Sequence, residues 1–208
     1  MENLVEVKNL KKKYGSKEAV KDISFNIKEN EILGLLGPNG SGKTTTIGMM
    51  LGLLKPSNGE ILIDGKKIEE NRIETLQKIN FISPYIELPK KLTVKQNLIV
   101  YCKLYNVSDI KNRIEYLVEK LRLEDLLNRV TGELSSGQKN RASLAKALIN
   151  NPRVLFLDEP TASLDPEIGD FVRSFLENYK KEKKISILLA SHNMNEVTRL
   201  CRTVLMMK

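Results

Sequence analysis

The chain has 208 residues, of which 41% are hydrophobic, and it carries a formal net charge of +8. This length and apolar content suffice for one sizeable α/β core and a small inserted lobe. No apolar run approaches the ~20 residues that a membrane-spanning helix needs, and the first residues lack the pattern of a secretory signal, so we expect a cytosolic chain.

The first part of the chain is predicted to form strands around one glycine-rich loop. Residues 4–10 and 23–27 alternate apolar and polar positions, as half-buried strands do. A short apolar strand over residues 32–36 leads into the loop at Gly37, and residues 44–54 follow with helical spacing. Further strands are expected at residues 60–64 and 79–82.

The pattern changes at about residue 84. From there to residue 150 the apolar residues follow helical spacing, whereas strand and helix patterns alternate again in the last part of the chain. The predicted helices lie near residues 94–105, 114–121, 136–149, 167–179 and 195–200, and the late strands near residues 154–157, 185–190 and 203–206.

Strands that alternate with helices predict an α/β fold with a largely parallel sheet. We expect residues 1–83 and 151–208 to form the core, with an antiparallel β part at the N-terminal end. Residues 84–150 are expected to form an inserted helical lobe. The chain ends at Lys208, soon after its last predicted strand, so we expect no appended regulatory domain.

The basic residues and the cysteines indicate no further chemistry. The densest positive runs, residues 11–13 and 180–184, are not interleaved with aromatic residues as a nucleic-acid surface would be. We therefore expect no nucleic-acid partner. Cys102 and Cys201 have no Cys or His beside them, which favours two small buried side chains over a disulfide or a metal site.

Residues 37–44 carry the most specific motif in the chain. They match G-x-x-x-x-G-K-[ST] and lie after a buried strand and before a helix, as that motif requires. Its glycines let backbone N–H groups curl around phosphate oxygens, and the helix N-terminus adds its positive dipole end. The alternative is a glycine-rich turn that happens to end in Lys-Thr. We expect a P-loop NTPase core whose phosphate contacts come from Gly37, Pro38, Asn39, Gly40, Ser41, Gly42, Lys43, Thr44 and Thr45.

Four side chains near this loop have distinct expected roles. Lys43 would reach the β- and γ-phosphates, and the Thr44 hydroxyl would ligate Mg²⁺. Asp158 and Glu159 end a buried strand, at the edge of an open α/β sheet where ligands bind. There Asp158 can hold Mg²⁺ and Glu159 can take a proton from the attacking water. The alternative is an acidic turn before Pro160.

His192 is a candidate partner of the γ-phosphate, and a second turn is a candidate for another phosphate contact. His192, the only histidine, follows another buried strand and is expected at the same edge of the sheet, although a lone histidine is more often structural. A second glycine-serine turn, residues 134–138, also precedes a helix, and its Ser135 lies 92 residues after Lys43. One nucleotide needs only one phosphate loop, so the second turn indicates a site closed from two sides.

Together these motifs resemble those of the ATP-binding-cassette (ABC) ATPase domain over nearly the whole chain. Residues 37–44 resemble its Walker A loop, and residues 134–138 resemble its Leu-Ser-Gly-Gly-Gln signature, with Ser136 in place of the first glycine. The other resemblances are residues 154–159 to Walker B, residues 163–165 to the D-loop, His192 to the switch histidine, and Tyr14 to an aromatic residue that stacks on adenine. For Tyr14 the alternative is a strand-end tyrosine.

The resemblance implies that two such domains pack head-to-tail around ATP and Mg²⁺, with the signature of one chain capping the ATP held by the other. Each site is then completed by residues of both chains. Beside the glycine loop and Tyr14, the implied site residues are Ser135, Ser136, Gly137, Gln138 and Asp165 for the nucleotide, Glu159 and His192 for catalysis, and Thr44 and Asp158 for the metal.

The chain looks most like the stand-alone ATPase subunits of bacterial ABC-2-type exporters. This implies an ATPase that powers transport of an unknown substrate, with export favoured, through a separate membrane-spanning permease. The expected partners are that permease and a second ATPase subunit, at the cytoplasmic face of the membrane. Two alternatives stay open: an ABC ATPase with a nucleic-acid-related or regulatory role, and a cassette that holds ATP but turns over little.

One position departs from the family pattern. Where relatives usually have a glutamine that contacts Mg²⁺, at the junction of core and lobe, this chain has Pro84. Proline has no side-chain donor or acceptor, so the resemblance leaves open how the lobe responds to the nucleotide. Ser83 is a candidate substitute.

Overall fold

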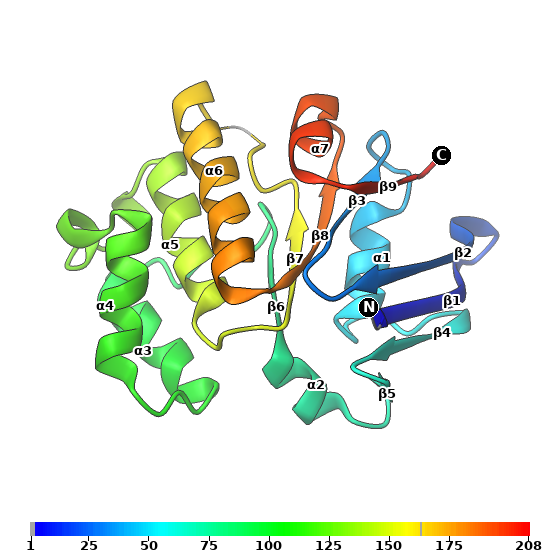
Figure 1. Cartoon of the computed structure of the whole chain (residues 1–208), viewed down its shortest axis with the longest axis horizontal. Coiled ribbons are helices and arrows are strands. Elements are labelled where there is room, and N and C mark those ends of the chain that lie inside the picture. Colours follow the sequence, from blue (N-terminus) through cyan, green and yellow to red (C-terminus); the bar gives the residue numbers. More distant parts are fainter. Residues whose placement is uncertain (1–2, 163) are drawn as a thin grey trace.

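The computed structural model describes residues 3–162 and 164–208, which form two β-sheets and the helices around them (Figure 1). The larger sheet is parallel, with the strand order β6-β7-β8-β3-β9. Its three central strands are mostly apolar and are buried along their whole length, as expected for a parallel sheet covered on both faces. The strands are β3 (Ile32–Leu36), β6 (Ile79–Ile82), β7 (Val154–Asp158), β8 (Ser186–Ser191) and β9 (Thr203–Met206).

The smaller sheet is antiparallel, with the order β2-β1-β4-β5. Its first two strands are longer than predicted, because polar residues continue the hydrogen-bonded ladder to the turn, where Lys13 pairs with Glu18 and Tyr14 with Lys17. A ladder needs only backbone groups, so the apolar pattern does not mark its end. The strands are β1 (Asn3–Tyr14), β2 (Lys17–Lys28), β4 (Asn58–Ile63) and β5 (Lys66–Lys67).

Helices α4 and α6 extend beyond their predicted limits, α4 beginning at Ile110 and α6 ending at Lys183. Two other helices also differ from the prediction. The first, α1, ends at Met50 because Gly52 adopts a left-handed conformation, φ +64°, and the Leu53 N–H bonds to the Gly48 carbonyl. The sequence pattern does not predict α2, which buries only Thr75 and so has no apolar periodicity. The helices are α1 (Lys43–Met50), α2 (Arg72–Lys78), α3 (Val94–Leu104), α4 (Ile110–Leu121), α5 (Ser136–Leu148), α6 (Pro166–Lys183) and α7 (Met194–Leu200), with 3₁₀ turns at Glu124–Leu126 and Thr131–Glu133.

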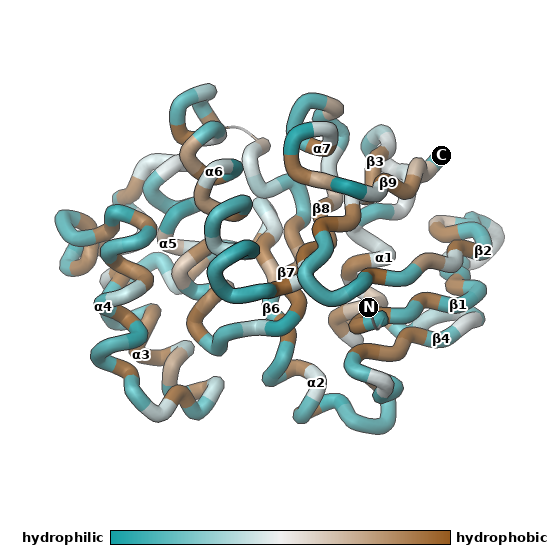
Figure 2. The backbone as a smooth tube through the Cα atoms, viewed as in Figure 1, coloured by the Kyte–Doolittle hydropathy of each residue, from teal (hydrophilic) through white to brown (hydrophobic). Residues whose placement is uncertain are grey.

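Alternate residues of the parallel strands pack into two hydrophobic clusters. In β7, Leu155 and Leu157 join a cluster with α3, α4, α5 and α6, while Val154 and Phe156 join a cluster with α1 and the antiparallel sheet. Figure 2 shows the hydrophobic residues concentrated in these central strands. The helical lobe therefore shares its core with the parallel sheet and α6. Its limits at residues 84 and 150 stay a prediction.

The order of the parallel strands decides where the candidate site lies. Strands β7, β8 and β3 are neighbours and run in the same direction, so the residues that follow them meet at one edge of the sheet. The glycine loop follows β3, Glu159 follows β7, and His192 follows β8. Three segments that are far apart in the sequence are thus brought together.

The cysteines are both free; Cys102 is buried and Cys201 is partly exposed. Burial raises the pKa of both thiols, that of Cys201 to about 12. Neither is therefore a reactive thiolate at neutral pH. None of the helices in the described part of the chain has the length and apolar character to cross a membrane.

Candidate nucleotide-binding and hydrolysis site

The loop between β3 and α1 has a backbone that only glycine can supply at several positions. Gly40 and Gly42 have φ angles of +87° and +96°, in the left-handed region. A Cβ atom on Gly37 would lie 2.4 Å from the Met207 carbonyl oxygen, and one on Gly42 would lie 2.4 Å from the Ala19 carbonyl oxygen. The loop is therefore held tightly against β2 and the end of β9.

The middle of the loop is open to solvent. Pro38, Asn39 and Gly40 are exposed, and among the described residues no side chain caps the first N–H groups of α1. Free N–H groups at the N-terminus of a helix favour an anion. This arrangement agrees with the predicted phosphate cradle, in which Thr45 lies partly exposed on the first turn of α1.

Lys43 places its amine over the loop. Its Nζ lies 2.6 Å from the carbonyl oxygen of Gly37 and 3.1 Å from that of Pro38. The same Nζ lies 3.8 Å from Oε1 of Glu159, and the Lys43 side chain is only 5% exposed. The cation is thus held between the loop and the catalytic carboxylate predicted from the sequence.

Thr44 and Asp158 meet as a metal site would require. The Thr44 hydroxyl donates a 2.8 Å hydrogen bond to Oδ2 of Asp158. Burial and the nearby Glu159 carboxylate raise the pKa of Asp158, while the Thr44 hydrogen bond and Lys43 oppose this rise. Oδ1 of Asp158 and Oγ of Ser41 are buried without a hydrogen-bond partner among the described residues. Carboxylate and hydroxyl oxygens are ligands that Mg²⁺ accepts, so these residues fit the predicted ion.

Glu159 has an unusual backbone and several polar neighbours. Its φ angle is +49°, a left-handed conformation that is uncommon outside glycine, and its N–H bonds to the Ala190 carbonyl oxygen at 2.8 Å. Oε1 lies 2.9 Å from Nδ1 of His192, and Oε2 accepts a long, 3.5 Å hydrogen bond from Ser191. The structure thus places His192 against Glu159; its contact with a γ-phosphate stays a prediction.

The signature turn forms the N-terminal cap of α5. Ser135 Oγ accepts from the Gln138 N–H at 3.3 Å, while Gln138 Oε1 accepts from the Ser135 N–H at 3.0 Å. Ser135 and Ser136 are exposed, and Gly137 is buried against Ile168, whose Cγ2 would lie 3.2 Å from an added Cβ. The serines thus form an exposed helix start that can face an external phosphate. Within this chain the Gln138 amide caps the helix, so its predicted nucleotide contact stays a prediction.

Two further predicted residues have local structural partners. Tyr14 lies at the end of β1 and is 50% exposed, with Lys12 Nζ 5.0 Å from its ring centre. Its hairpin is the one that contacts Gly42 through Ala19, which places an exposed ring on the strand pair that holds the loop. Asp165 caps α6 by accepting from the Ile168 N–H at 3.0 Å. Contacts of both with a nucleotide stay predictions, and Ser163 of the predicted D-loop lies outside the described residues.

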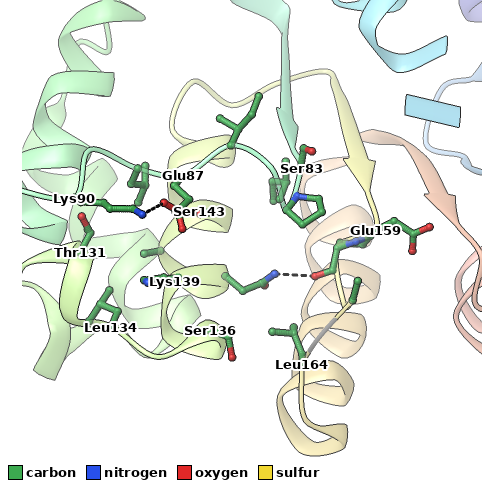
Figure 3. A pocket seen from close by; sticks show the side chains of 18 residues that line it. Ser83, Glu87, Lys90, Thr131, Leu134, Ser136, Lys139, Ser143, Glu159 and Leu164 are labelled. Carbon is green, nitrogen blue, oxygen red and sulfur yellow. Dashed lines mark hydrogen bonds and ion pairs between the residues drawn. The ribbon is translucent and has the colours of Figure 1, made fainter. Parts of the chain in front are cut away.

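A cavity of about 350 Å³ separates the lobe from the core next to Glu159. Figure 3 shows Ser83, Ser136 and Glu159 on its walls, contributed by three different segments, and Pro84 also lines it. The sequence does not predict two polar contacts in this region, because both join distant residues. Asn140 Nδ2 donates to the Pro160 carbonyl oxygen at 2.7 Å, and the Thr161 hydroxyl donates to Glu196 at 2.7 Å.

A glycine loop at the end of the buried parallel strand β3, facing an acidic pair at the end of β7 one strand away across β8, defines a P-loop nucleotide-binding fold. A family model described as "ABC transporter" matches residues 20–162, well over half of the chain. The chain therefore belongs to the ABC transporter family.

Similar proteins support this assignment. The chain is 37% identical over 203 residues to the bacitracin transport ATP-binding protein BcrA of Bacillus licheniformis, covering 96% of this chain and 65% of BcrA. It is 38% identical over 192 residues to the ABC transporter ATP-binding protein NatA of Bacillus subtilis, covering 91% of this chain and 78% of NatA. The chain thus spans just under two thirds of the length of BcrA.

The solved structures agree with the fold. The bacterial ABC transporter cassette MJ0796, described as a dimer, superposes with a TM-score of 0.89 at 28% identity, covering 98% of this chain and 94% of that one. A second dimeric structure of MJ0796, in a post-hydrolysis state bound to ADP and Pi, matches equally well. The α/β fold with its parallel and antiparallel sheets is the fold of an ABC cassette, as the sequence predicts.

Proposed function

We propose that this chain binds MgATP and hydrolyses it, and that hydrolysis powers transport through a separate membrane subunit. The observation that carries the proposal is the meeting of three groups at adjacent strand ends. These are the glycine loop with Lys43, the Thr44–Asp158 pair, and the Glu159–His192 pair. Phosphate binding, metal binding and proton acceptance are thereby assembled at one edge of the sheet.

Each residue has a role that its position supports. The loop N–H groups and Lys43 bind the β- and γ-phosphates. Thr44 and Asp158 would hold Mg²⁺, which would supply positive charge next to the phosphates. Glu159 accepts the proton of the attacking water, and His192 holds the Glu159 carboxylate in place at 2.9 Å.

We further propose that two chains enclose two ATP molecules head-to-tail. The support is the exposed helix start at Ser135 and Ser136, which has an unused anion-binding face in the single chain. The similar cassette MJ0796 is described as a dimer. In this arrangement the signature of the helical lobe, residues 84–150, caps the nucleotide held by the core of the partner.

The role in transport is supported by the relatives. BcrA is named as a bacitracin transport protein and NatA as an ABC transporter ATP-binding protein. We propose that this chain acts at the cytoplasmic face of a membrane, on a permease subunit, and that the transport is export.

The first test is nucleotide binding and turnover by the purified chain and its Lys43→Ala variant. Removing the amine that faces the β- and γ-phosphates is expected to abolish tight MgATP binding and measurable hydrolysis. Lys111→Ala, which removes an exposed lysine from α4, is the matched control and should behave as wild type. If Lys43→Ala binds and hydrolyses MgATP as well as wild type does, the assignment of the loop is wrong.

A further inference from the structure

The segment that follows Glu159 is held from two sides by side chains that no motif assigns. On one side, Asn140 Nδ2 on α5 donates to the Pro160 carbonyl oxygen at 2.7 Å. On the other side, the Thr161 hydroxyl donates to Glu196 on α7 at 2.7 Å, and Glu196 is only 1% exposed. The peptide next to the catalytic carboxylate is therefore fixed between the lobe and α7.

The amide of Asn140 can face Pro160 in only one way. A carbonyl oxygen only accepts hydrogen bonds, so the NH₂ group must point at it. Oδ1 of Asn140 is then buried without a hydrogen-bond partner among the described residues. A buried acceptor without a partner costs free energy, so the observed orientation indicates that the bond to Pro160 determines where this side chain lies.

Glu159 depends on its neighbours for its conformation. Its left-handed φ of +49° is unfavourable for a residue with a Cβ atom and persists only where contacts enforce it. The enforcing contacts are the Ala190 carbonyl on its own N–H, the Ala162 N–H on its carbonyl at 3.1 Å, and the Asn140 bond one peptide further on. Loss of the last contact leaves the carboxylate less well directed at His192.

Asn140 and the signature lie on the same helix, α5. Asn140 lies four residues after Ser136, close to the same face of the helix. A rotation of the lobe that shifts the signature must therefore pull on the Pro160 carbonyl. Pro84, which lines the cavity between the lobe and the core, offers no side-chain donor or acceptor for such a link.

We infer that Asn140 is a positioning residue that ties the orientation of the helical lobe to the Glu159 carboxylate through the Pro160 carbonyl. The inference rests on the proposed ATPase function. In this role Asn140 acts through Glu159 rather than on the nucleotide itself. The lobe thus controls hydrolysis through its own helix α5 as well as by presenting the signature to a partner chain.

The first experiment needs no nucleotide. The chain has one histidine, so its imidazole gives a single Cε1–H resonance, and His192 lies 2.9 Å from Glu159. At fixed pH, Asn140→Ala should move this resonance from its wild-type position toward that of Glu159→Gln. The control is Ser143→Ala on the next turn of α5, which lines the same cavity and should leave the resonance unmoved. A resonance that is unchanged in Asn140→Ala, or moved as far in Ser143→Ala, overturns the inference.

The second experiment measures steady-state ATP hydrolysis. Asn140→Ala should lower kcat about tenfold, the effect of one lost hydrogen bond, with KM and ATP affinity within about twofold of wild type. Asn140→Asp serves as a second variant of the same shape if Asn140→Ala fails to fold. The positioning role is overturned if kcat of Asn140→Ala equals that of wild type. It is also overturned if KM and the affinity for ATP worsen by as much as kcat falls. A wild-type chain that neither binds nor hydrolyses ATP would contradict the proposed function instead, whatever the resonance shows.

Discussion

At the scale of single residues, the site is organised around Glu159. Its left-handed conformation costs about 1–2 kcal/mol. In this conformation Oε1 of Glu159 lies 2.9 Å from Nδ1 of His192 and 3.8 Å from Nζ of Lys43. Strained backbone conformations of this kind are concentrated at functional sites.

The general-base role of Glu159 predicts a specific pattern in Glu159→Gln. The amide cannot accept the proton of the attacking water, so hydrolysis should slow by about 10²- to 10⁴-fold while MgATP still binds. Single-turnover hydrolysis and equilibrium binding measured on the same preparation check both parts. Glu115→Gln, at an exposed position of α4, is the control. Hydrolysis at the wild-type rate would exclude Glu159 as the base.

Lys146 is a buried cation that the proposed chemistry does not use. It is 8% exposed, it donates to the Phe81 carbonyl oxygen at 3.2 Å, and its amine lies 5.0 Å and 5.5 Å from the ring centres of Phe81 and Tyr101. Burial lowers the pKa of the Lys146 amine from its ordinary value of 10.5 to about 8. The two rings favour the charged form and oppose part of this lowering.

This lowered pKa makes stability depend on pH. Between about pH 8 and 10.5 the unfolded chain holds a proton on Lys146 that the folded chain has lost, so the contribution of Lys146 to stability rises with pH, by at most about 3 kcal/mol. Below about pH 8 the buried Lys146 amine is charged, and its full destabilising effect is present. Lys146→Met should remove this dependence.

Urea unfolding at pH 7 and pH 10 tests the prediction. The free energy of unfolding of wild type, relative to Lys146→Met, should rise between the two pH values. The exposed-site control Lys111→Met should show no such rise relative to wild type. A constant difference between wild type and Lys146→Met would mean that Lys146 stays charged in the folded chain throughout this range.

At the scale of elements, the junction between β6 and the lobe is a tight turn. The Ile86 N–H bonds to the Ser83 carbonyl oxygen at 3.2 Å, and the Tyr85 N–H bonds to the Ser83 hydroxyl at 3.4 Å. Pro84 restricts φ to about −65° and has no N–H. The Ser83 hydroxyl is thus engaged within the turn, which limits its use as the substitute for a glutamine at residue 84.

Pro84→Gln should raise the basal ATPase rate of the isolated chain. A side-chain amide at this position can bind Mg²⁺ and the attacking water, and one such hydrogen bond to a charged centre is worth about 1.5–3 kcal/mol, or about ten- to a hundredfold in rate. Tyr85→Gln places the same amide on the exposed neighbour and is the control. If the folded Pro84→Gln chain is no faster than wild type, another group already makes this contact.

At the scale of the whole molecule, the head-to-tail dimer predicts a defect at Ser135. Ser135→Arg removes the capping hydroxyl and adds a bulky cation at the start of α5. ATP-driven dimer formation, measured by light scattering, should be lost, while each chain still binds ATP. Ser108→Arg, at another exposed serine of the lobe, is the control and should dimerise normally.

Mixing two variants shows whether each nucleotide site is formed within one chain or between two chains. Ser135→Arg combined with Lys43→Ala can rebuild at most one complete site per dimer if each site uses the loop of one chain and the signature of the other. Partial recovery of hydrolysis in the mixture is expected. Wild-type hydrolysis by Ser135→Arg alone would show that the signature is not part of the catalytic surface.

The sequence by itself determined the local parts of this protein. The glycine loop of residues 37–44, the acidic pair at the end of β7 and the capped start of α5 each depend on residue types at short, fixed spacing, because turns, caps and strand ends are set by neighbouring backbone. Buried strands were recognisable because both faces of a parallel strand are apolar. The polar helix α2 and the full lengths of β1 and β2 were missed because neither is marked by apolar periodicity.

Only the tertiary structure decided which of these parts meet. Strand order β6-β7-β8-β3-β9 sets Lys43 3.8 Å from Glu159 and His192 2.9 Å from it. The hydrogen bond between Asn140 and Pro160 joins two residues 20 positions apart, and the sequence around either residue does not predict the contact. Such contacts arise from the packing of the lobe and α7 against the sheet, and packing depends on the whole set of buried side chains rather than on any short stretch of sequence.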